Sequence, residues 1–492
     1  GNLSKYTRMK SDNYFNSDEF KKKLQQYREM LQSGERVYFD ADTLLDIAEY
    51  FDATHRHDLA RDCANYAHQL HPDEALPLIY MARLSLDDGK LDQAKQMASA
   101  VIEKECYEYY LLHGEILLYQ LDINKANALF NQALTKIEES DFSDFLTDVA
   151  AIFLDYEYPL RALKWLEKID GGNYDARCQL LEAECYLNLE EYEKVYELLK
   201  HILDNNPYDI QAWILQAETQ YSHAHYEEAI ESCDFALAID PNNEHALKIK
   251  GCASEDLHEE EKAHACYNKY LDIDPENALI QLLDGNCLLT LNRPKEALIR
   301  LKKAGMLMQQ QNNNLDKTFI PLAKAYAQVG DLTNAFEYIE KAVHAGYPHF
   351  NTDIVKIEIM LQHDMKYEAT AQLSSMLHNP DLSDENYMKI AQLTFTYQLY
   401  DFSLTLFKHI SKNVDYQKEC YPYMAYIYRQ KHNSDEYLRY ISMACVMSPR
   451  TTKRLFSSIY PETDVKFYPE MALKEKWQSS PSDQNDSSEK KD

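Results

Sequence analysis

The residues of this sequence best suited to metal chemistry form two His-x-His pairs, His55/His57 followed by Asp58, and His223/His225. Two adjacent imidazoles and a carboxylate are a ligand set that zinc accepts. Histidines two positions apart do not share one face of a helix, however, and neither stretch offers a further ligand. We therefore interpret both pairs as solvated turn residues, and we expect no metal site and no cofactor.

Acid–base catalysis would need two carboxyls in a closed pocket that separates their pKa values. Glu259, Glu260 and Glu261 are adjacent, but a run of this kind in a turn is typical of solvated carboxylates. The chain also lacks a G-x-S-x-G motif, a Walker loop, an H-E-x-x-H pair and an EF-hand loop. We expect no catalytic residues and a protein that is not an enzyme.

The ten cysteines include no C-x-x-C pair, which argues against a zinc ribbon or a thioredoxin-like site. They are typical of small buried thiols in a reducing compartment. The longest apolar runs, Val149–Leu154 and Tyr423–Tyr428, are far shorter than the about 20 residues of a spanning helix. We expect a cytoplasmic protein without a membrane span. The missing initiator methionine leaves a removed secretion signal open.

The net charge of the chain restricts the classes of partner that it can bind. Of 492 residues, 81 are acidic and 51 are basic, which gives a formal net charge of −30. A polyanion of this strength is not expected to bind nucleic acid, because phosphate contacts need Lys and Arg. Residues 101–300 hold 40 acidic and 16 basic side chains, so most of the net charge lies there.

An internal repeat supplies the elements that must position any site. Pro207, Pro241 and Pro275 are spaced by 34 residues, and extending this register gives twelve copies. They begin near residues 41, 75, 107, 143, 176, 210, 244, 278, 316, 351, 384 and 418. The eighth position is Gly or Ala in all copies but one: Ala48, Ala82, Gly114, Ala150, Ala183, Ala217, Gly251, Gly285, Ala323, Glu358, Ala391 and Ala425.

Each copy carries two apolar stripes at helical spacing, separated by a short polar turn. In the sixth copy Trp213 and Ala217 lie on the first helix, and Ala229, Cys233 and Ala236 on the second. Small residues at positions eight and twenty let the two helices approach closely, and one hairpin cannot bury both stripes. Neighbouring hairpins must therefore stack.

At this point the chain resembles the tetratricopeptide repeat family over about residues 41–451. Two copies are close to the family pattern: Trp213/Ala217/Tyr226/Ala229/Ala236/Pro241 and Phe319/Ala323/Tyr326/Gly330/Ala335/Ala342. The resemblance implies an all-α fold, a right-handed superhelix of about twelve helix-turn-helix repeats. It also implies a concave surface lined by the first helix of each pair.

Departures from the pattern predict five segments. Residues 1–40 hold a capping helix at 18–33, with Phe20, Leu24, Tyr27 and Leu31 as its apolar side chains. Residues 41–311 form repeats one to eight and end in an extended helix. Residues 312–315 form a hinge loop, and residues 316–451 form repeats nine to twelve. Residues 452–492 form a C-terminal cap, with Leu455, Phe456, Ile459 and Tyr460, and a disordered polar tail.

The repeat geometry that the resemblance implies turns position nine of each first helix toward the concave groove. Four of the first six position-nine residues are Glu and none of the last six is, which predicts a groove that is acidic in its N-terminal half and neutral to mildly basic after residue 316. Surface Glu also simply favours helices, and this second explanation stays open. The predicted partner-binding residues are Glu49, Arg83, Glu115, Glu184, Glu218, Tyr221, Asn286, Lys324, Gln392 and Tyr426.

The family's carboxylate clamp is not reproduced, because Cys252 stands where the clamp has Asn and Leu283 fills the next position. We expect a non-catalytic scaffold that binds an extended peptide or helix in the groove, with a basic partner at the N-terminal half. The alternative is a regulatory or sensor array that responds to a ligand or peptide and switches at the hinge, residues 306–315. The oligomeric state is open.

Overall fold

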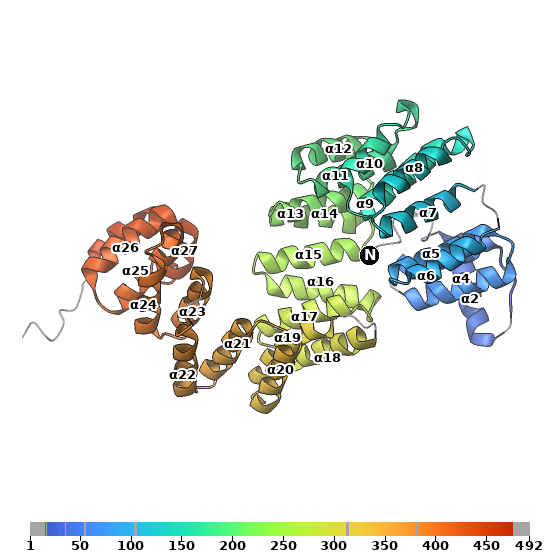
Figure 1. The fold of residues 1–492 in the computed structure, drawn as a ribbon. Helices are drawn as coiled ribbons and strands as arrows, with labels where there is room; N and C mark the ends of the chain where they lie inside the picture. Colours follow the sequence, from blue (N-terminus) through green and yellow to red (C-terminus); the bar gives the residue numbers. More distant parts are fainter. Residues whose placement is uncertain are drawn as a thin grey trace, which may run out of the picture. The chain divides into compact units, whose positions relative to one another are not determined.

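The computed structural model describes residues 15, 17–34, 36–53, 56–102, 106–310, 314–379 and 382–475, and every regular element in this part of the chain is a helix. Twelve hairpins follow one another in chain order (Figure 1). Their first helices are α3 (Ala41–Ala53), α5 (Ala75–Asp87), α7 (Tyr107–Tyr119), α9 (Phe142–Asp155), α11 (Ala176–Asn188), α13 (Ile210–Ser222), α15 (Glu244–Asp256), α17 (Ala278–Thr290), α19 (Phe319–Gln328), α21 (His349–Gln362), α23 (Asp384–Thr396) and α25 (Gln417–Gln430).

The second helices are α4 (His57–Leu70), α6 (Leu91–Ala100), α8 (Ile123–Ala133), α10 (Pro159–Leu166), α12 (Tyr192–Asn205), α14 (Tyr226–Ile239), α16 (Glu260–Ile273), α18 (Pro294–Gln310), α20 (Leu332–His344), α22 (Lys366–Leu377), α24 (Tyr400–Ile410) and α26 (Ser434–Met447). Every predicted repeat start lies within about three residues of the start of a first helix, which is the scatter expected of helix ends. The predicted all-α fold of stacked hairpins is confirmed.

Close approach of the two helices explains the small residues at position eight. An added Cβ at Gly114 would lie 2.0 Å from the Phe130 ring, and one at Gly251 would lie 2.4 Å from the Tyr267 ring. Alanines at the same position, such as Ala217, are fully buried. The aromatic rings of α8 and α16 therefore occupy the space that a side chain on the first helix would need.

The turn inside each hairpin repeats as regularly as the helices. In the sixth repeat the Ala224 backbone is left-handed, with φ of 58°. The His225 N–H donates to the Gln220 carbonyl at 2.8 Å, and the Ala224 N–H donates to the Tyr221 carbonyl at 3.0 Å. This Schellman arrangement satisfies the last carbonyls of the first helix and reverses the chain.

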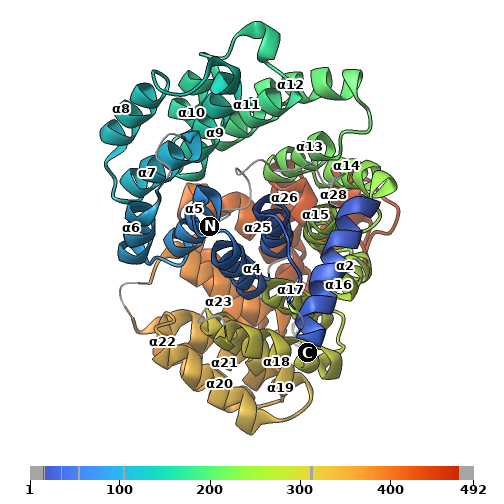
Figure 2. The same cartoon turned by 90° about the vertical axis from the view of Figure 1, so that its right-hand side faces the viewer.

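First helices bury more of their side chains than second helices do. In α9 every residue from Phe145 to Leu154 is buried, whereas α12 buries only Val195, Leu199 and Ile202. Between α7 and α12 the first helices lie on the inner side of the curve and the second helices on the outer side (Figure 2). The inner surface is therefore built from first helices, as the resemblance implies.

The chain divides into two compact units, residues 1–313 and 314–492. The extended helix expected at the end of repeat eight is α18, which reaches Gln310. Of the predicted hinge, residues 311–313 lie outside the described part of the chain, and η4 (Leu315–Thr318) follows. The placement of a hinge at 312–315 remains a prediction.

The two ends of the repeat array carry additional helices. At the N-terminal end, α2 (Asp18–Ser33) covers the predicted capping helix and buries Phe20, Leu24 and Tyr27. Of its two neighbouring apolar residues one turn after Tyr27, Met30 is buried and Leu31, which the sequence pattern singled out, is 51% exposed.

At the C-terminal end, α27 (Pro449–Phe456), η6 (Val465–Phe467) and α28 (Tyr468–Lys474) follow the last hairpin. Phe456 and Tyr460 are buried there, and Leu455 and Ile459 are half-buried against the same core. The polar tail predicted from Gln478 onward lies outside the described residues, which end at Glu475. No helix in the described part of the chain has the length and hydropathy that crossing a bilayer requires.

The remaining short helices lie between hairpins: η2 (Glu139–Asp141), η3 (Gly171–Asn173) and η5 (Val414–Tyr416). The ten cysteines form no disulfide and are buried or half-buried.

Candidate binding surface

The histidine pairs singled out by the sequence lie in or beside turns. The rings of His223 and His225 are 4.4 Å apart, and His223 stacks on Tyr192. In the first repeat, His57 Nδ1 lies 2.6 Å from Asp52 Oδ1, while His55 is outside the described residues. Among the residues that the structure describes, no three His, Cys, Asp or Glu side chains are grouped so as to hold a metal ion.

Most of the predicted groove residues are half-exposed on first helices. Glu184 lies on α11, Glu218 on α13 and Asn286 on α17, each at the ninth position of its repeat. Tyr221 follows on α13 and donates its hydroxyl to Asp256 at 2.7 Å. The half-exposed set is Glu49, Glu184, Glu218, Tyr221, Asn286, Lys324, Gln392 and Tyr426.

Two predicted groove residues are withdrawn from solvent. Arg83 on α5 and Glu115 on α7 are only 5% and 6% exposed, and Arg83 Nε donates to Glu115 Oε2 at 2.9 Å. Burial raises the pKa of Glu115, while the Arg83 guanidinium opposes the rise. In the chain alone these two side chains neutralise each other between neighbouring repeats, and contact of either with a partner remains a prediction.

A second ion pair between a buried carboxylate and an arginine joins the next two repeats. Asp148 on α9 is 4% exposed and accepts a hydrogen bond from Arg177 of α11 at 2.6 Å. Burial raises the pKa of Asp148 to about 6. Sequence reasoning missed this pair, although opposite charges about one repeat apart, as in Arg83 and Glu115, are the signal that could have found it.

Charged residues of the second unit are paired in a similar way. Lys324 on α19 lies 3.4 Å from Glu358 on α21, which places Glu358 as the counter-charge of the preceding repeat. Arg429 on α25 lies 3.2 Å from Glu475, just after α28. Within each pair the opposite charges neutralise each other, and a neutral groove in repeats nine to twelve remains a prediction.

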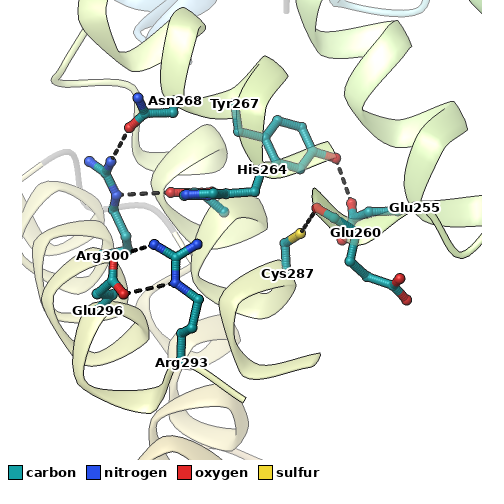
Figure 3. Close-up of polar contacts among 10 residues, drawn as sticks. Glu255, Glu260, His264, Tyr267, Asn268, Cys287, Arg293, Glu296 and Arg300 are labelled. Atoms are coloured by element: carbon teal, nitrogen blue, oxygen red, sulfur yellow. Dashed lines mark hydrogen bonds and ion pairs between the residues drawn. The ribbon is translucent and has the colours of Figure 1, made fainter. Parts of the chain in front are cut away.

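A buried charge cluster links repeats seven and eight, and we call Asp284, His264 and Arg300 the Asp284 cluster. Asp284 on α17 is fully buried. His264 Nδ1 lies 2.6 Å from Oδ1, and the Nε of Arg300 lies 2.9 Å from Oδ2 as an ion pair without hydrogen-bond alignment. His264 and Arg300 approach from α16 and α18, and Arg300 also donates to Asn268 at 2.7 Å (Figure 3).

Two polar side chains beside the Asp284 cluster are hydrogen-bonded. The Tyr267 hydroxyl donates to Glu255 at 2.5 Å (Figure 3). The Cys287 thiol donates to the Glu260 carbonyl at 3.1 Å, and burial raises its pKa to about 12. A thiol with so high a pKa is not a nucleophile at neutral pH, so His264, Asp284 and Cys287 do not form a catalytic set.

A second charge cluster is arranged differently, and we call Asp52, Tyr80 and Asp87 the N-terminal acidic cluster. Asp52 is the second-to-last residue of α3, and Asp87 is the last residue of α5. Burial and the charges of Asp52 and Glu115 raise the pKa of Asp87 to about 7. The Asp87 side chain is nevertheless exposed, so solvent screens these charges.

Comparisons with known proteins give no sequence relative: the chain matches no family model and no curated protein. Solved structures with similar folds include yeast Tom70, which is 16% identical to this chain. The match has a TM-score of 0.43 and covers 88% of this chain and 95% of Tom70. A tetratricopeptide repeat protein from Parabacteroides merdae is 15% identical, with a TM-score of 0.42 over 50% of this chain and 96% of that one.

The type IV pilus biogenesis factor PilW is 18% identical, with a TM-score of 0.37 over 43% of this chain and 96% of that one. Identities and TM-scores of this size carry no functional argument. The assignment of the fold therefore rests on the repeated hairpins of this chain.

Proposed function

We propose that this chain, a repeat protein of the tetratricopeptide type, is a non-catalytic scaffold that binds an extended peptide or helix of a partner protein along its inner surface. The observation that carries the proposal is a row of half-exposed polar side chains on the first helices of the first unit, which Cys252 on α15 interrupts. Glu184, Glu218 and Asn286 occupy the same repeat position on α11, α13 and α17. An extended chain matches such a row, because its side chains recur at regular intervals.

The state of the polar groups supports binding rather than catalysis. The buried acids Glu115, Asp148 and Asp284 each have a cationic partner. Groups with satisfied partners hold neighbouring repeats together and leave no general base aimed at a substrate. The ten unpaired thiols agree with a reducing compartment, and we place the protein in the cytoplasm on that basis.

Charge reversal in the row tests the proposal. A variant with Glu184→Lys and Glu218→Lys is compared with wild type in affinity purification at low salt, and each retained protein is then measured with purified components. A partner that uses the row should bind at least about tenfold more weakly to the variant, and its affinity for wild type should fall as salt rises.

The matched control carries the same change of charge away from the row. Glu190 lies in the turn before α12, and Glu227 lies on α14, and both are exposed. A variant with Glu190→Lys and Glu227→Lys should keep the partner. Equal loss in the two variants, or a purified chain that turns over a substrate without any protein partner, would overturn the proposal.

A further inference from the structure

The outer face of repeats six to eight changes the sign of its charge across three successive second helices, α14, α16 and α18. Residues three or four apart share one face of a helix, and repeat positions 18, 22, 25, 26 and 29 form the exposed face of each. These positions hold mainly carboxylates on α14, both signs on α16 and mainly lysines on α18: Glu227, Glu231, Asp234, Phe235 and Ala238; Glu261, Ala265, Asn268, Lys269 and Asp272; Lys295, Ile299, Lys302, Lys303 and Met306.

The three exposed faces adjoin one another within the first unit. The second helix of each repeat packs on the first helix of the next, α14 on α15 and α16 on α17. Arg300 of α18 donates to Asn268 of α16 at 2.7 Å (Figure 3). With helices about 10 Å apart and about 21 Å long, the face covers about 600 Å², which approaches the about 800 Å² that each partner buries in a stable interface.

The helix dipole does not explain this charge pattern. It favours carboxylates in the first turn of a helix and cations in the last turn. Lys295, however, is the second residue of α18, where a cation is disfavoured. Glu231 lies beyond the first turn of α14 and four residues after Glu227, and such a like-charge pair weakens a helix. An opposite charge that approaches from outside the chain would stabilise both residues.

Exposed apolar side chains lie among these charges at both ends of the face. Ile299 and Met306 on α18 are 69% and 63% exposed, and Phe235 on α14 is 55% exposed. The Phe235 ring stacks on Trp213 with the ring centroids 4.5 Å apart, which holds it in place. Rigid aromatic and long apolar side chains at the centre of a patch are typical of protein–protein interfaces.

We propose that this outer face binds the same face of a second copy of the chain in a two-fold dimer. The dimer places α14 of each copy against α18 of the other and brings the two α16 helices together. A uniformly acidic or basic partner would match one end of the face and repel the other. A two-fold rotation reverses the order of the helices, so the chain itself supplies the complement, and each contact forms twice.

The centre of the face and the net charge are compatible with this arrangement. Ala265 lies in the middle of the exposed face of α16, and so small a side chain lets the two α16 helices approach. The net charge of −30 on each copy opposes association. At physiological salt, however, charges are screened over about 8 Å, so the facing Glu and Lys side chains outweigh distant charges. The inference goes beyond the proposed function, because it uses second helices and not the row on the first helices.

Sedimentation velocity of the full chain at physiological salt, from about 1 to about 100 µM, measures the dimer. Two variants reverse the charge at one end each, Glu227→Lys/Glu231→Lys on α14 and Lys295→Glu/Lys303→Glu on α18. Each alone should dimerise at least about tenfold more weakly than wild type, because like charges then face each other. The control Glu138→Lys/Glu139→Lys, at two exposed residues of η2, should change the affinity less than twofold.

An equimolar mixture of the two reversed variants separates lost complementarity from misfolding. In the mixed dimer the new lysines on α14 face the new glutamates on α18, and the other contact is that of wild type. The mixture should therefore dimerise within about threefold of wild type. Circular dichroism checks the helical content of each variant, and the single reversals Glu231→Lys and Lys295→Glu replace a pair that loses it.

Three results would overturn the inference: a wild-type chain that stays monomeric at about 100 µM, reversed variants that dimerise as wild type does, or folded variants whose mixture stays monomeric. Dimerisation that is lost in Glu184→Lys/Glu218→Lys but kept in the α14 and α18 variants would also overturn it, because the second copy would then occupy the row on the first helices.

Discussion

The Asp284 cluster and the N-terminal acidic cluster place the same kinds of side chain in opposite states. Asp284 is fully buried but has His264 on one oxygen and Arg300 on the other, and the nearby Tyr267 hydroxyl is bonded to Glu255. Asp87 has no such partner in the described chain, and the Tyr80 hydroxyl beside it is unsatisfied. The first cluster joins two repeats, whereas in the second Asp52 is paired with His57 and the Tyr80 hydroxyl has no partner among the described residues.

The difference shows which observation separates these buried polar groups in a repeat array. Burial alone does not, because Asp284, Glu115 and Tyr80 are all buried. What separates them is a charged or hydrogen-bonding neighbour: Asp284 has His264 and Arg300, although its Oδ2 accepts no aligned hydrogen bond, and Glu115 has Arg83, whereas no partner of the Tyr80 hydroxyl lies among the described residues. The predictions below break or sharpen this contrast.

The largest effect is expected from removing the satisfied charge. Asp284→Ala leaves His264 and Arg300 without their shared acceptor and should destabilise repeats seven and eight by about 3–5 kcal/mol. Urea denaturation combined with hydrogen exchange of α16–α18 measures the loss. Glu296→Gln, in the exposed pair with Arg293 (Figure 3), is the control and should leave the midpoint almost unchanged.

The Arg83–Glu115 pair should respond as a unit. Arg83→Met leaves a buried carboxylate unpaired and should cost about 3 kcal/mol. Adding Glu115→Leu should recover most of that loss, since the double variant leaves no buried charge alone. Urea midpoints of the two single variants and the double variant test this; simply additive losses would show that the two side chains do not depend on each other.

Asp87→Asn should stabilise the free chain, in contrast to Asp284→Ala. The folded pKa of Asp87, about 7, lies above the ordinary value of 3.8, so folding favours its protonated form. Its penalty is absent below about pH 4, grows as the pH rises, and is complete above pH 7. With allowance for solvent screening, the variant should gain about 1 kcal/mol at pH 8 and nothing at pH 4. Urea titrations at both pH values check this, and a gain that did not depend on pH would count against it.

The smallest contrast compares two tyrosine hydroxyls. Tyr267→Phe removes a donor to Glu255 and should cost about 1 kcal/mol. Tyr80→Phe removes an unsatisfied hydroxyl and should cost nothing, or stabilise the free chain by up to about 1 kcal/mol. Thermal denaturation of both variants measures the difference. Equal losses would mean that the Tyr80 hydroxyl already has a partner.

Repeats and helix ends could be predicted from the sequence because they follow from local spacing. Gly114 and Gly251 mark close helix contacts, and the 34-residue period fixes where each hairpin starts. Two neighbouring apolar residues, Met30 and Leu31, compete for one face of α2, and only the packing decides between them.

The state of each groove residue could not be predicted in the same way. Arg83 and Glu115 stand at the expected position, but their mutual pairing depends on how far α5 and α7 are displaced along each other. Tyr80 and Asp87 lie outside the groove positions considered in the sequence. Their lack of partners is a property of three-dimensional contacts, and no spacing rule reports it. Whether Glu184 and Glu218 contact a partner stays a prediction.

The pH dependence of stability tests the contrast between the two clusters most directly. Urea denaturation of wild type, Asp87→Asn and Asp284→Ala is compared at pH 4 and pH 8. Asp87→Asn should be more stable than wild type at pH 8 and equal to it at pH 4, because burial and like charges raise the pKa of this carboxyl to about 7. Asp284→Ala should be less stable than wild type at pH 8, because it leaves Arg300 without its acceptor. Equal changes in the two variants at pH 8 would contradict the account.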